Sequence, residues 1–218
     1  DPVLSLQIEG ALEEYSKGNN LTLSKFQKDI WQALEENSTI AISGPTSAGK
    51  SFVIQEYIKN EIENSENYLS LYIVPSRALL SEVAQDMNDS LKDDVDVRTS
   101  ADPDKDYSEG KFVLILTPER CLRLLQSEYN FKPEIIFYDE VQSMGESDRG
   151  VLMEDVLSSL EERWSESKIV VAGPNIENPE KPLLEHGYTL QEPINTLLTP
   201  IFQLKTSIKF QPQRGARG

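Results

Sequence analysis

The sequence is poor in the residues that build disulfides and most metal sites. Its 218 residues include one cysteine, Cys121, and one histidine, His186. A single cysteine excludes an intramolecular disulfide and a metal site with two thiolates, and the apolar residues that follow it predict a buried thiol. A reducing, cytoplasmic setting fits, or a nuclear one in a eukaryote. The run around His186 predicts a helix end, where a cationic side chain is favoured, and not a catalytic base.

Long apolar runs are also absent, and so is an excess of basic charge. No run approaches the roughly 18 residues of a membrane span, so we expect no membrane partner. The first residues lack a signal-peptide pattern and resemble a cut within a longer chain. The formal net charge of −16 argues against general adhesion to nucleic acid but allows a local groove. The acidic stretch 86–109 is expected to be a solvated loop region, and the basic stretch 201–218 a linker or tail.

The sequence does contain short apolar runs that alternate with helical patterns. The predicted buried strands are Ile40–Ile42, Leu69–Val74, Phe112–Leu116, Ile135–Tyr138 and Ile169–Ala172, with a weaker strand at Val95–Thr99. A capping box at Ser24–Gln27 predicts the start of one helix, and others are expected within 51–62, 78–87, 120–125 and 151–164. This alternation predicts an α/β fold, with a parallel sheet sandwiched between helices and ligands beyond the carboxyl ends of the strands.

A phosphate-binding loop follows the first predicted strand. The eight residues Gly44, Pro45, Thr46, Ser47, Ala48, Gly49, Lys50 and Ser51 fit the P-loop pattern G-x-x-x-x-G-K-[ST] in full. Small residues let backbone N–H groups curl around a β-phosphate, and the following helix points its positive end at the same oxygens. Lys50 would bind the β- and γ-phosphates, and Ser51 would bind Mg²⁺. The predicted ligand is ATP with Mg²⁺.

Two acids follow another predicted strand. Asp139 and Glu140 come directly after the apolar run Ile135–Tyr138. Asp139 would hold Mg²⁺ through its water shell, while Glu140 would orient and deprotonate the attacking water. Nucleotide binding alone does not require the second acid, whereas hydrolysis does. A solvated Asp-Glu turn is the alternative interpretation.

Together these residues resemble the first RecA-like domain of a superfamily two helicase of the superkiller-type DExH group. The likeness covers roughly residues 20–190. The motifs stand in family order as Gly44–Ser51, Pro75-Ser76-Arg77, Thr117-Pro118-Glu119-Arg120, Asp139-Glu140-Val141-Gln142 and Ala172-Gly173-Pro174. Two departures are visible. Gln142 stands where the family usually has His, and Ala172, Gly173 and Pro174 replace a Ser-Ala-Thr motif that couples ATP state to strand separation in relatives.

The resemblance implies roles for further residues. Gln27 would read adenine, although it is also the third residue of a capping box. The residues that would contact the backbone of a tracked nucleic-acid strand are Pro75, Arg77, Thr117, Pro118 and Arg120. Gln142 would retain a link to the γ-phosphate side. The alternative is that both prolines merely end strands and that the arginines are solvated.

The resemblance also implies a domain plan. Residues 1–20 would lead into a RecA-like domain at 21–197, and 198–218 would lead toward a second RecA-like domain that the chain does not contain. An arginine finger from such a domain is worth ~10³–10⁵ in rate, so this chain alone is expected to bind ATP weakly and hydrolyse it poorly.

The predicted function is ATP hydrolysis coupled to translocation, unwinding or remodelling of DNA or RNA. Two alternatives stay open. One is a P-loop ATPase of another class, which would lack the segments at Pro75 and Thr117. The other is a regulatory module that uses ATP as a switch, which the altered Ala172-Gly173-Pro174 motif favours and the intact Lys50 and Glu140 oppose.

Overall fold

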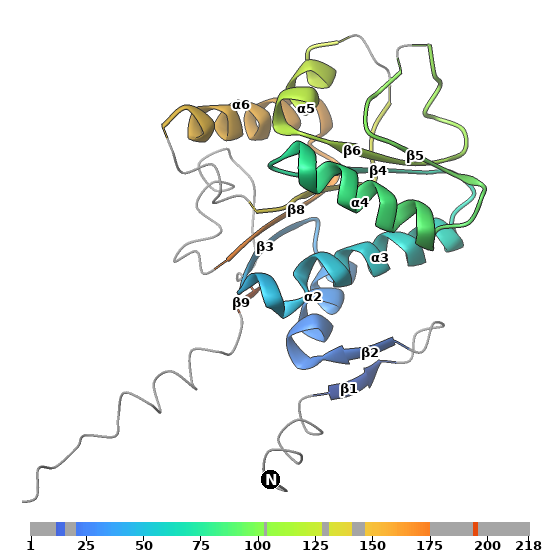
Figure 1. Cartoon of the computed structure of the whole chain (residues 1–218), viewed down its shortest axis with the longest axis vertical. Coiled ribbons are helices and arrows are strands. Elements are labelled where there is room, and N and C mark those ends of the chain that lie inside the picture. The colour runs from blue at the N-terminus through green and yellow to red at the C-terminus, as the bar shows by residue number, and fades with distance from the viewer. Residues whose placement is uncertain are drawn as a thin grey trace, which may run out of the picture.

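A twisted parallel sheet forms the centre of the molecule (Figure 1). The computed structural model describes residues 12–15, 21–102, 104–127, 131–140, 147–174 and 194–195. Within these ranges the sheet has seven strands in the order β5-β6-β4-β7-β8-β3-β9, and neighbouring strands run parallel. The strands are β3 (Thr39–Ser43), β4 (Tyr68–Ile73), β5 (Val95–Arg98), β6 (Lys111–Leu116), β7 (Ile135–Tyr138), β8 (Lys168–Gly173) and β9 (Ile194–Asn195).

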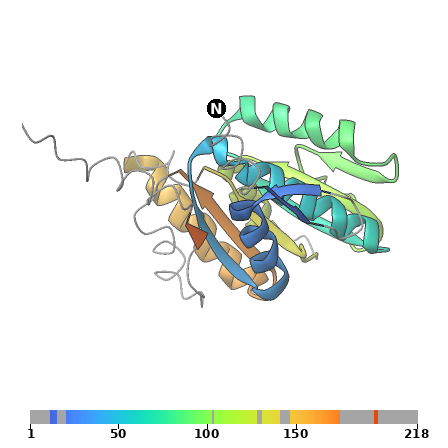
Figure 2. The same cartoon turned by 90° about the horizontal axis from the view of Figure 1, so that it is seen from below.

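Helices cover both faces of this sheet (Figure 2). They are α2 (Lys25–Glu36), α3 (Lys50–Asn64), α4 (Arg77–Ser90), α5 (Pro118–Leu125) and α6 (Ser147–Trp164), with a short 3₁₀ helix η1 (Thr46–Ala48). A separate antiparallel pair, β1 (Leu12–Tyr15) and β2 (Leu21–Ser24), precedes α2. None of the helices within the described ranges is long and apolar enough to span a membrane.

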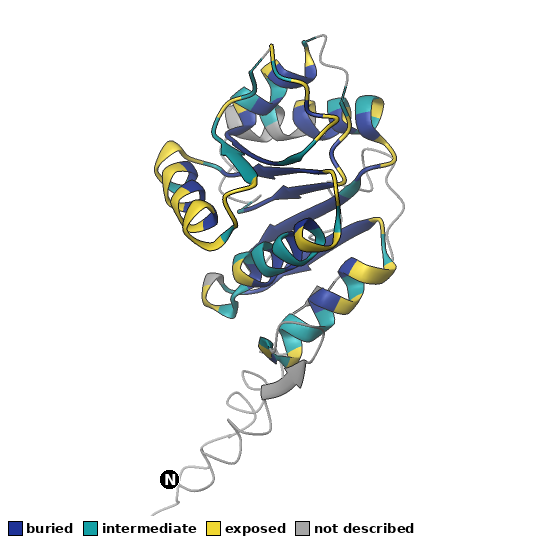
Figure 3. Cartoon of the chain, turned by 90° about the vertical axis from the view of Figure 1, so that its right-hand side faces the viewer, coloured by how far each residue is buried: buried dark blue, intermediate teal, exposed yellow. Residues whose placement is uncertain are grey.

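Successive residues of each central strand face two different cores. In β4, Tyr72 joins the core under α2, α3 and α4, while Leu71 and Ile73 join the core under α5 and α6. Because both faces are covered, β3, β4, β6, β7 and β8 are buried along nearly their whole length, as the dark blue strands of Figure 3 show, whereas the edge strand β5 is half-buried. This two-sided burial explains why the strands read as continuous apolar runs and not as alternating patterns.

The predicted α/β fold and its strands are confirmed, with ends that shift by a residue or two. The capping box is confirmed too: the Gln27 N–H donates to Ser24 Oγ at 3.3 Å, and the Ser24 N–H donates to Gln27 Oε1 at 2.9 Å. Cys121 is buried, as predicted. The prediction of a loop at 86–109 is wrong in part, because α4 continues to Ser90 and β5 lies within the stretch. Strands β1, β2 and β9 were not predicted from the sequence.

Candidate nucleotide and nucleic-acid site

The P-loop connects β3 to α3 at the carboxyl edge of the sheet. The 3₁₀ turn η1 carries the chain around, and the Ala48 N–H donates to the Pro45 carbonyl at 2.9 Å. Lys50 folds back into this loop, where its Nζ donates to the carbonyls of Gly44 at 2.7 Å and Pro45 at 3.1 Å. Only 1% of Lys50 is exposed. The loop thus holds an ammonium group inside its own curve, at the start of a 15-residue helix.

Glycine at position 49 is favoured by its backbone conformation, and a side chain there would also displace the flexible end of Gln27. Its φ of 74° lies in the left-handed region, which a side chain disfavours. A Cβ at this position would also lie closer to Gln27 Nε2 than real Cβ atoms approach. Gln27 Nε2 donates to the Ala48 carbonyl at 3.5 Å. The predicted adenine-reading Gln27 therefore packs directly on the P-loop, while its Oε1 caps α2.

Replacing Gly49 with Ala should lower the free energy of unfolding. The left-handed backbone costs ~1–2 kcal/mol with a side chain, and displacement of Gln27 adds to this loss. Urea unfolding of wild type, Gly49→Ala, Gln27→Ala and the double variant separates the two causes. If the clash with Gln27 contributes, Gly49→Ala lowers the free energy of unfolding by less in the Gln27→Ala background than in the wild type. Equal stability of Gly49→Ala and wild type would contradict the prediction.

Asp139 lies at the end of β7 and meets the P-loop helix. Ser51 Oγ donates to Asp139 Oδ2 at 2.7 Å, which joins residues 88 positions apart in the sequence. The Tyr72 hydroxyl, from the neighbouring β4, donates to the same oxygen at 3.3 Å. Tyr72 is fully buried and packs edge-on against Phe137, with ring centroids 4.8 Å apart. The buried aromatic pair thus positions the carboxylate opposite the P-loop.

The donor set of this contact fits Mg²⁺. A serine hydroxyl and a carboxylate are the hard oxygen ligands that Mg²⁺ takes, and it completes its shell with substrate phosphates and waters. Within the described part of the chain, no group of three or more His, Cys, Asp or Glu side chains could hold a metal by itself. Ser51 and Asp139 are accordingly the residues that would hold a magnesium ion brought with a nucleotide.

Burial shifts the pKa values of both charged groups in this site. Desolvation lowers the pKa of Lys50, against the attraction of Glu140 and Asp139. Desolvation raises the pKa of Asp139, against the hydrogen bond from Ser51. In each case the protein disfavours the charged form in the absence of ligand. A bound polyphosphate with its metal would supply the missing opposite charges.

Asp139→Asn should stabilise the ligand-free protein, and increasingly so as pH rises. When a folded carboxyl has a raised pKa, the folded state binds more protons than the unfolded state between the two pKa values. The free energy of unfolding of the wild type therefore falls as pH rises through that window. The neutral amide of the variant does not titrate and avoids this loss. Urea unfolding of both proteins at acidic and neutral pH measures the difference in their free energies of unfolding. Asp155→Asn, on the exposed side of α6, is the control. A gain that shrinks toward neutral pH would contradict the prediction.

Glu140 has an unusual backbone. Its φ of 53° is the one positive value outside glycine among the described residues. Its N–H donates to Asp139 Oδ1 at 2.9 Å. A left-handed conformation at a non-glycine residue costs ~1–3 kcal/mol and is concentrated at functional sites. The turn fixes the two neighbouring acids relative to each other.

The altered third motif lies beside the P-loop. Ala172 and Gly173 end β8, which pairs with β3, and Pro174 follows. The Gly44 N–H, at the start of the P-loop, donates to the Gly173 carbonyl at 3.1 Å. The motif has no hydroxyl, yet its backbone remains bonded to the loop.

The predicted nucleic-acid segments come together at the ends of β4 and β6. A hollow of about 370 Å³ is lined by Pro75, Ser76, Arg77, Thr117, Glu119, Arg120 and Arg123. Arg77 is exposed at the first position of α4, whereas Thr117 and Pro118 are buried at the start of α5. The Arg120 Nη1 donates to the Thr99 carbonyl at 2.6 Å, so this arginine also holds the chain that follows β5.

Some predicted residues cannot be placed. Gln142 and His186 lie outside the described residues, as does the side chain of Thr46. The contact of Tyr72 with Asp139 and the place of Arg123 in the hollow were not predicted from the sequence. The apolar run of β4 gave no sign that the Tyr72 hydroxyl would reach the acid of another strand. For Arg123, the only signal was its position three residues after Arg120, which places both on one side of a helix.

Comparison with known proteins decides the family. Residues 24–175, well over half of the chain, match the family model described as DEAD/DEAH box helicase. The chain belongs to the DEAD/DEAH box helicase family. The match spans the P-loop, the arginine-lined hollow, the two acids and β8.

Curated relatives of this helicase domain are much longer than the chain. It is 25% identical over 171 residues to the ATP-dependent DNA helicase Hel308 of Thermoplasma volcanium. The matched region covers 74% of this chain and 24% of that protein. It is 26% identical over 180 residues to the antiviral helicase SKI2 of Saccharomyces cerevisiae. Here the matched region covers 82% of this chain and 13% of that protein. The chain thus spans less than a quarter of these relatives. The resemblance to a first RecA-like domain of the superkiller-type group is confirmed.

Solved structures share the fold of the domain. The helicase MrfA, solved bound to DNA, superposes with a TM-score of 0.57 at 16% identity, over 82% of this chain and 28% of that one. The UvsW helicase of bacteriophage T4 gives a TM-score of 0.52 at 20% identity, over 90% of this chain and 68% of that one. At these identities the likeness concerns the fold alone.

Proposed function

We propose that this chain is the ATP-binding motor domain of a nucleic-acid-dependent ATPase of helicase type. The observation that carries the proposal is the hydrogen bond between Ser51 and Asp139 at 2.7 Å, because it brings the P-loop and the acidic motif into one site. Lys50 binds the β- and γ-phosphates of ATP, Ser51 and Asp139 hold Mg²⁺, and Glu140 orients and deprotonates the attacking water. The Mg²⁺ that Ser51 and Asp139 would hold would supply positive charge beside the phosphates. Gln27, on the P-loop, reads the adenine.

The second half of the proposal concerns nucleic acid. The arginine-lined hollow lies beyond β4 and β6, at the carboxyl edge that also holds the nucleotide site. Arg77 and the start of α5 offer a guanidinium, a hydroxyl and a helix N-terminus to a strand backbone, contacts that position without reading sequence. Relatives carry both DNA helicase and RNA helicase in their names. The proposed partner is therefore the backbone of a single strand of DNA or RNA.

The proposal includes a second RecA-like domain that completes the ATP site. The curated relatives are several times longer than this chain, which leaves ample room for one. The missing hydroxyls at 172–174 favour translocation or remodelling over efficient strand separation. The hydrogen bond from the Gly44 N–H to the Gly173 carbonyl still connects the P-loop, where ATP would bind, to this motif.

ATP turnover with and without single-stranded DNA or RNA tests the proposal, on protein that carries this chain together with its second motor domain. We expect turnover to rise when nucleic acid is added. A rate of ATP turnover that does not change when nucleic acid is added would indicate a P-loop ATPase of another class. Binding of ATP without any turnover would indicate a nucleotide switch. Either result would overturn the proposal.

A further inference from the structure

Arg123 differs from most arginines around it because it has no partner among the described residues. Arg98 is paired with Asp96 and Asp102. Arg120 donates to the Thr99 carbonyl, and Arg163 donates to carbonyls of the chain that ends α5. Arg123 makes no comparable hydrogen bond or ion pair within the described ranges, and its side chain is exposed.

Arg123 lies between two hollows. The first is the hollow of about 370 Å³ that also holds Arg77 and Thr117. The second, of about 300 Å³, is lined by Ser100, Ala101, Leu116, Arg120, Arg123, Leu124 and Ser127. Arg120 and Arg123 belong to both linings, so the two hollows adjoin across these side chains. Three guanidinium groups line the first hollow against the single carboxylate of Glu119.

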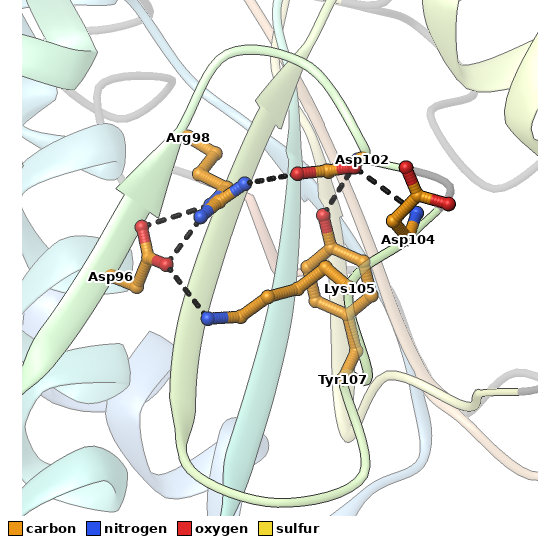
Figure 4. Close-up of polar contacts among 6 residues, drawn as sticks. All are labelled: Asp96, Arg98, Asp102, Asp104, Lys105 and Tyr107. Atoms are coloured by element: carbon orange, nitrogen blue, oxygen red, sulfur yellow. Dashed lines mark hydrogen bonds and ion pairs between the residues drawn. The ribbon is translucent and has the colours of Figure 1, made fainter.

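The far wall of the second hollow is held in place before any ligand arrives. Arg98 lies between Asp96 and Asp102 (Figure 4). Its Nε donates to Asp96 Oδ2 at 2.9 Å, and its Nη1 donates to Asp102 Oδ2 at 3.2 Å. Lys105 Nζ lies 3.5 Å from Asp96, and the Asp102 N–H donates to the Tyr107 hydroxyl at 2.8 Å. These bonds tie down the chain on both sides of Ser100 and Ala101. They also pair Asp96 with Arg98 and Lys105, and Asp102 with Arg98.

The position of α5 is fixed as well. Its buried face consists of Cys121, Leu124 and Leu125, which pack in the core under α5 and α6. Arg163 of α6 donates to the carbonyls of Leu125 and Ser127 and anchors the end of the helix. Arg123 therefore projects from an anchored helix whose other face is held in the core.

We infer that Arg123 binds a backbone phosphate of single-stranded nucleic acid, one more than Arg77 and the start of α5 would bind. The inference rests on the proposed function. An exposed, unpaired guanidinium beside an arginine-lined hollow suits a phosphate, which it can bind with two parallel hydrogen bonds. The contact positions the strand and carries no sequence preference, so DNA and RNA should depend on it alike.

Binding of fluorescent single-stranded DNA and RNA, followed by anisotropy over a range of salt concentrations, tests this inference on the same protein as the turnover assay, which carries this chain together with its second motor domain. Binding without sequence preference has a Kd of ~10⁻⁴–10⁻⁶ M, so the protein is titrated through that range at low salt. Arg123→Ala should weaken binding of both oligonucleotides several-fold. It should also reduce the salt slope by ~0.7, the value for one lost phosphate on a single strand. Arg123→Glu should weaken binding further, and Arg123→Lys should retain most of it.

Two further variants separate the inference from the proposed function. Arg77→Ala should weaken binding like Arg123→Ala. Lys92→Ala should leave it unchanged, because Lys92 is paired with Glu63 at the amino end of the sheet. If Arg77→Ala weakens binding while Arg123→Ala matches the wild type in Kd and slope, the inference is wrong and the proposed function survives. If the wild type itself binds neither oligonucleotide, both are wrong. Unchanged thermal unfolding of Arg123→Ala excludes a folding defect.

Discussion

Lys50→Ala should abolish measurable binding of ATP to this chain. The ammonium group is buried within the P-loop and donates hydrogen bonds to the carbonyls of Gly44 and Pro45. A bound polyphosphate would compete with these carbonyls for the hydrogen bonds of Lys50. Truncating one partner of a buried charge pair costs ~2–5 kcal/mol or more, a loss of roughly 30-fold to several thousand-fold in affinity. Titration calorimetry, or anisotropy of a fluorescent ATP analogue, measures the loss.

Lys59→Ala is the matched control for this experiment. Lys59 is on the same helix, α3, and is paired with Glu56 away from the loop. Its replacement removes an equal charge and should leave ATP affinity unchanged. Unfolding curves for both variants show whether the loop still folds without its central ammonium. If folded Lys50→Ala bound ATP within threefold of the wild type, the phosphate role of Lys50 would be refuted.

Glu140→Gln should stop hydrolysis and leave ATP binding intact. The substitution keeps the size of the side chain and removes the base, and a positioned general base contributes ~10²–10⁴ in rate. Asp139, Ser51 and Lys50 remain to bind the metal and phosphates. Turnover is measured on protein that includes the second motor domain, with nucleic acid present, and binding is measured in parallel.

Glu36→Gln at the exposed end of α2 is the control for the loss of one carboxylate. It should turn over ATP at the rate of the wild type. Glu140 would lose its proposed role if Glu140→Gln hydrolysed ATP normally. A combined loss of binding and turnover would instead indicate that the left-handed turn at Glu140 had collapsed.

Much of the fold and of the nucleotide site could be predicted from the sequence. The strands are buried on both faces, so each appears as an apolar run, and parallel strands align their carboxyl ends at one edge. Together with the P-loop pattern, that rule predicted that Ser51 and Asp139 would both hold one Mg²⁺. The two side chains, 88 positions apart in the sequence, are joined by a hydrogen bond. The P-loop could be predicted from its local sequence pattern alone, because its function depends on backbone N–H groups and two side chains within eight residues.

Contacts that depend on three-dimensional register could not be predicted in this way. Tyr72 reaches Asp139 because β4 and β7 pair in one particular register, Tyr72 with Phe137. Gln27 contacts the P-loop because α2 packs beside α3. The motif around Arg120 predicts a phosphate contact, and it gave no sign of the hydrogen bond from its guanidinium to the Thr99 carbonyl. A sequence motif identifies the residue type, while the structure determines which partner it has.

The most direct test of the account is a crystal structure of this chain with Mg²⁺ and a non-hydrolysable ATP analogue. The account predicts that the β- and γ-phosphates lie within Gly44–Ser51 and contact Lys50 Nζ. It also predicts that the metal binds Ser51 Oγ, with Asp139 in contact with the metal's water shell. A polyphosphate bound elsewhere, or a metal distant from both Ser51 and Asp139, would contradict it.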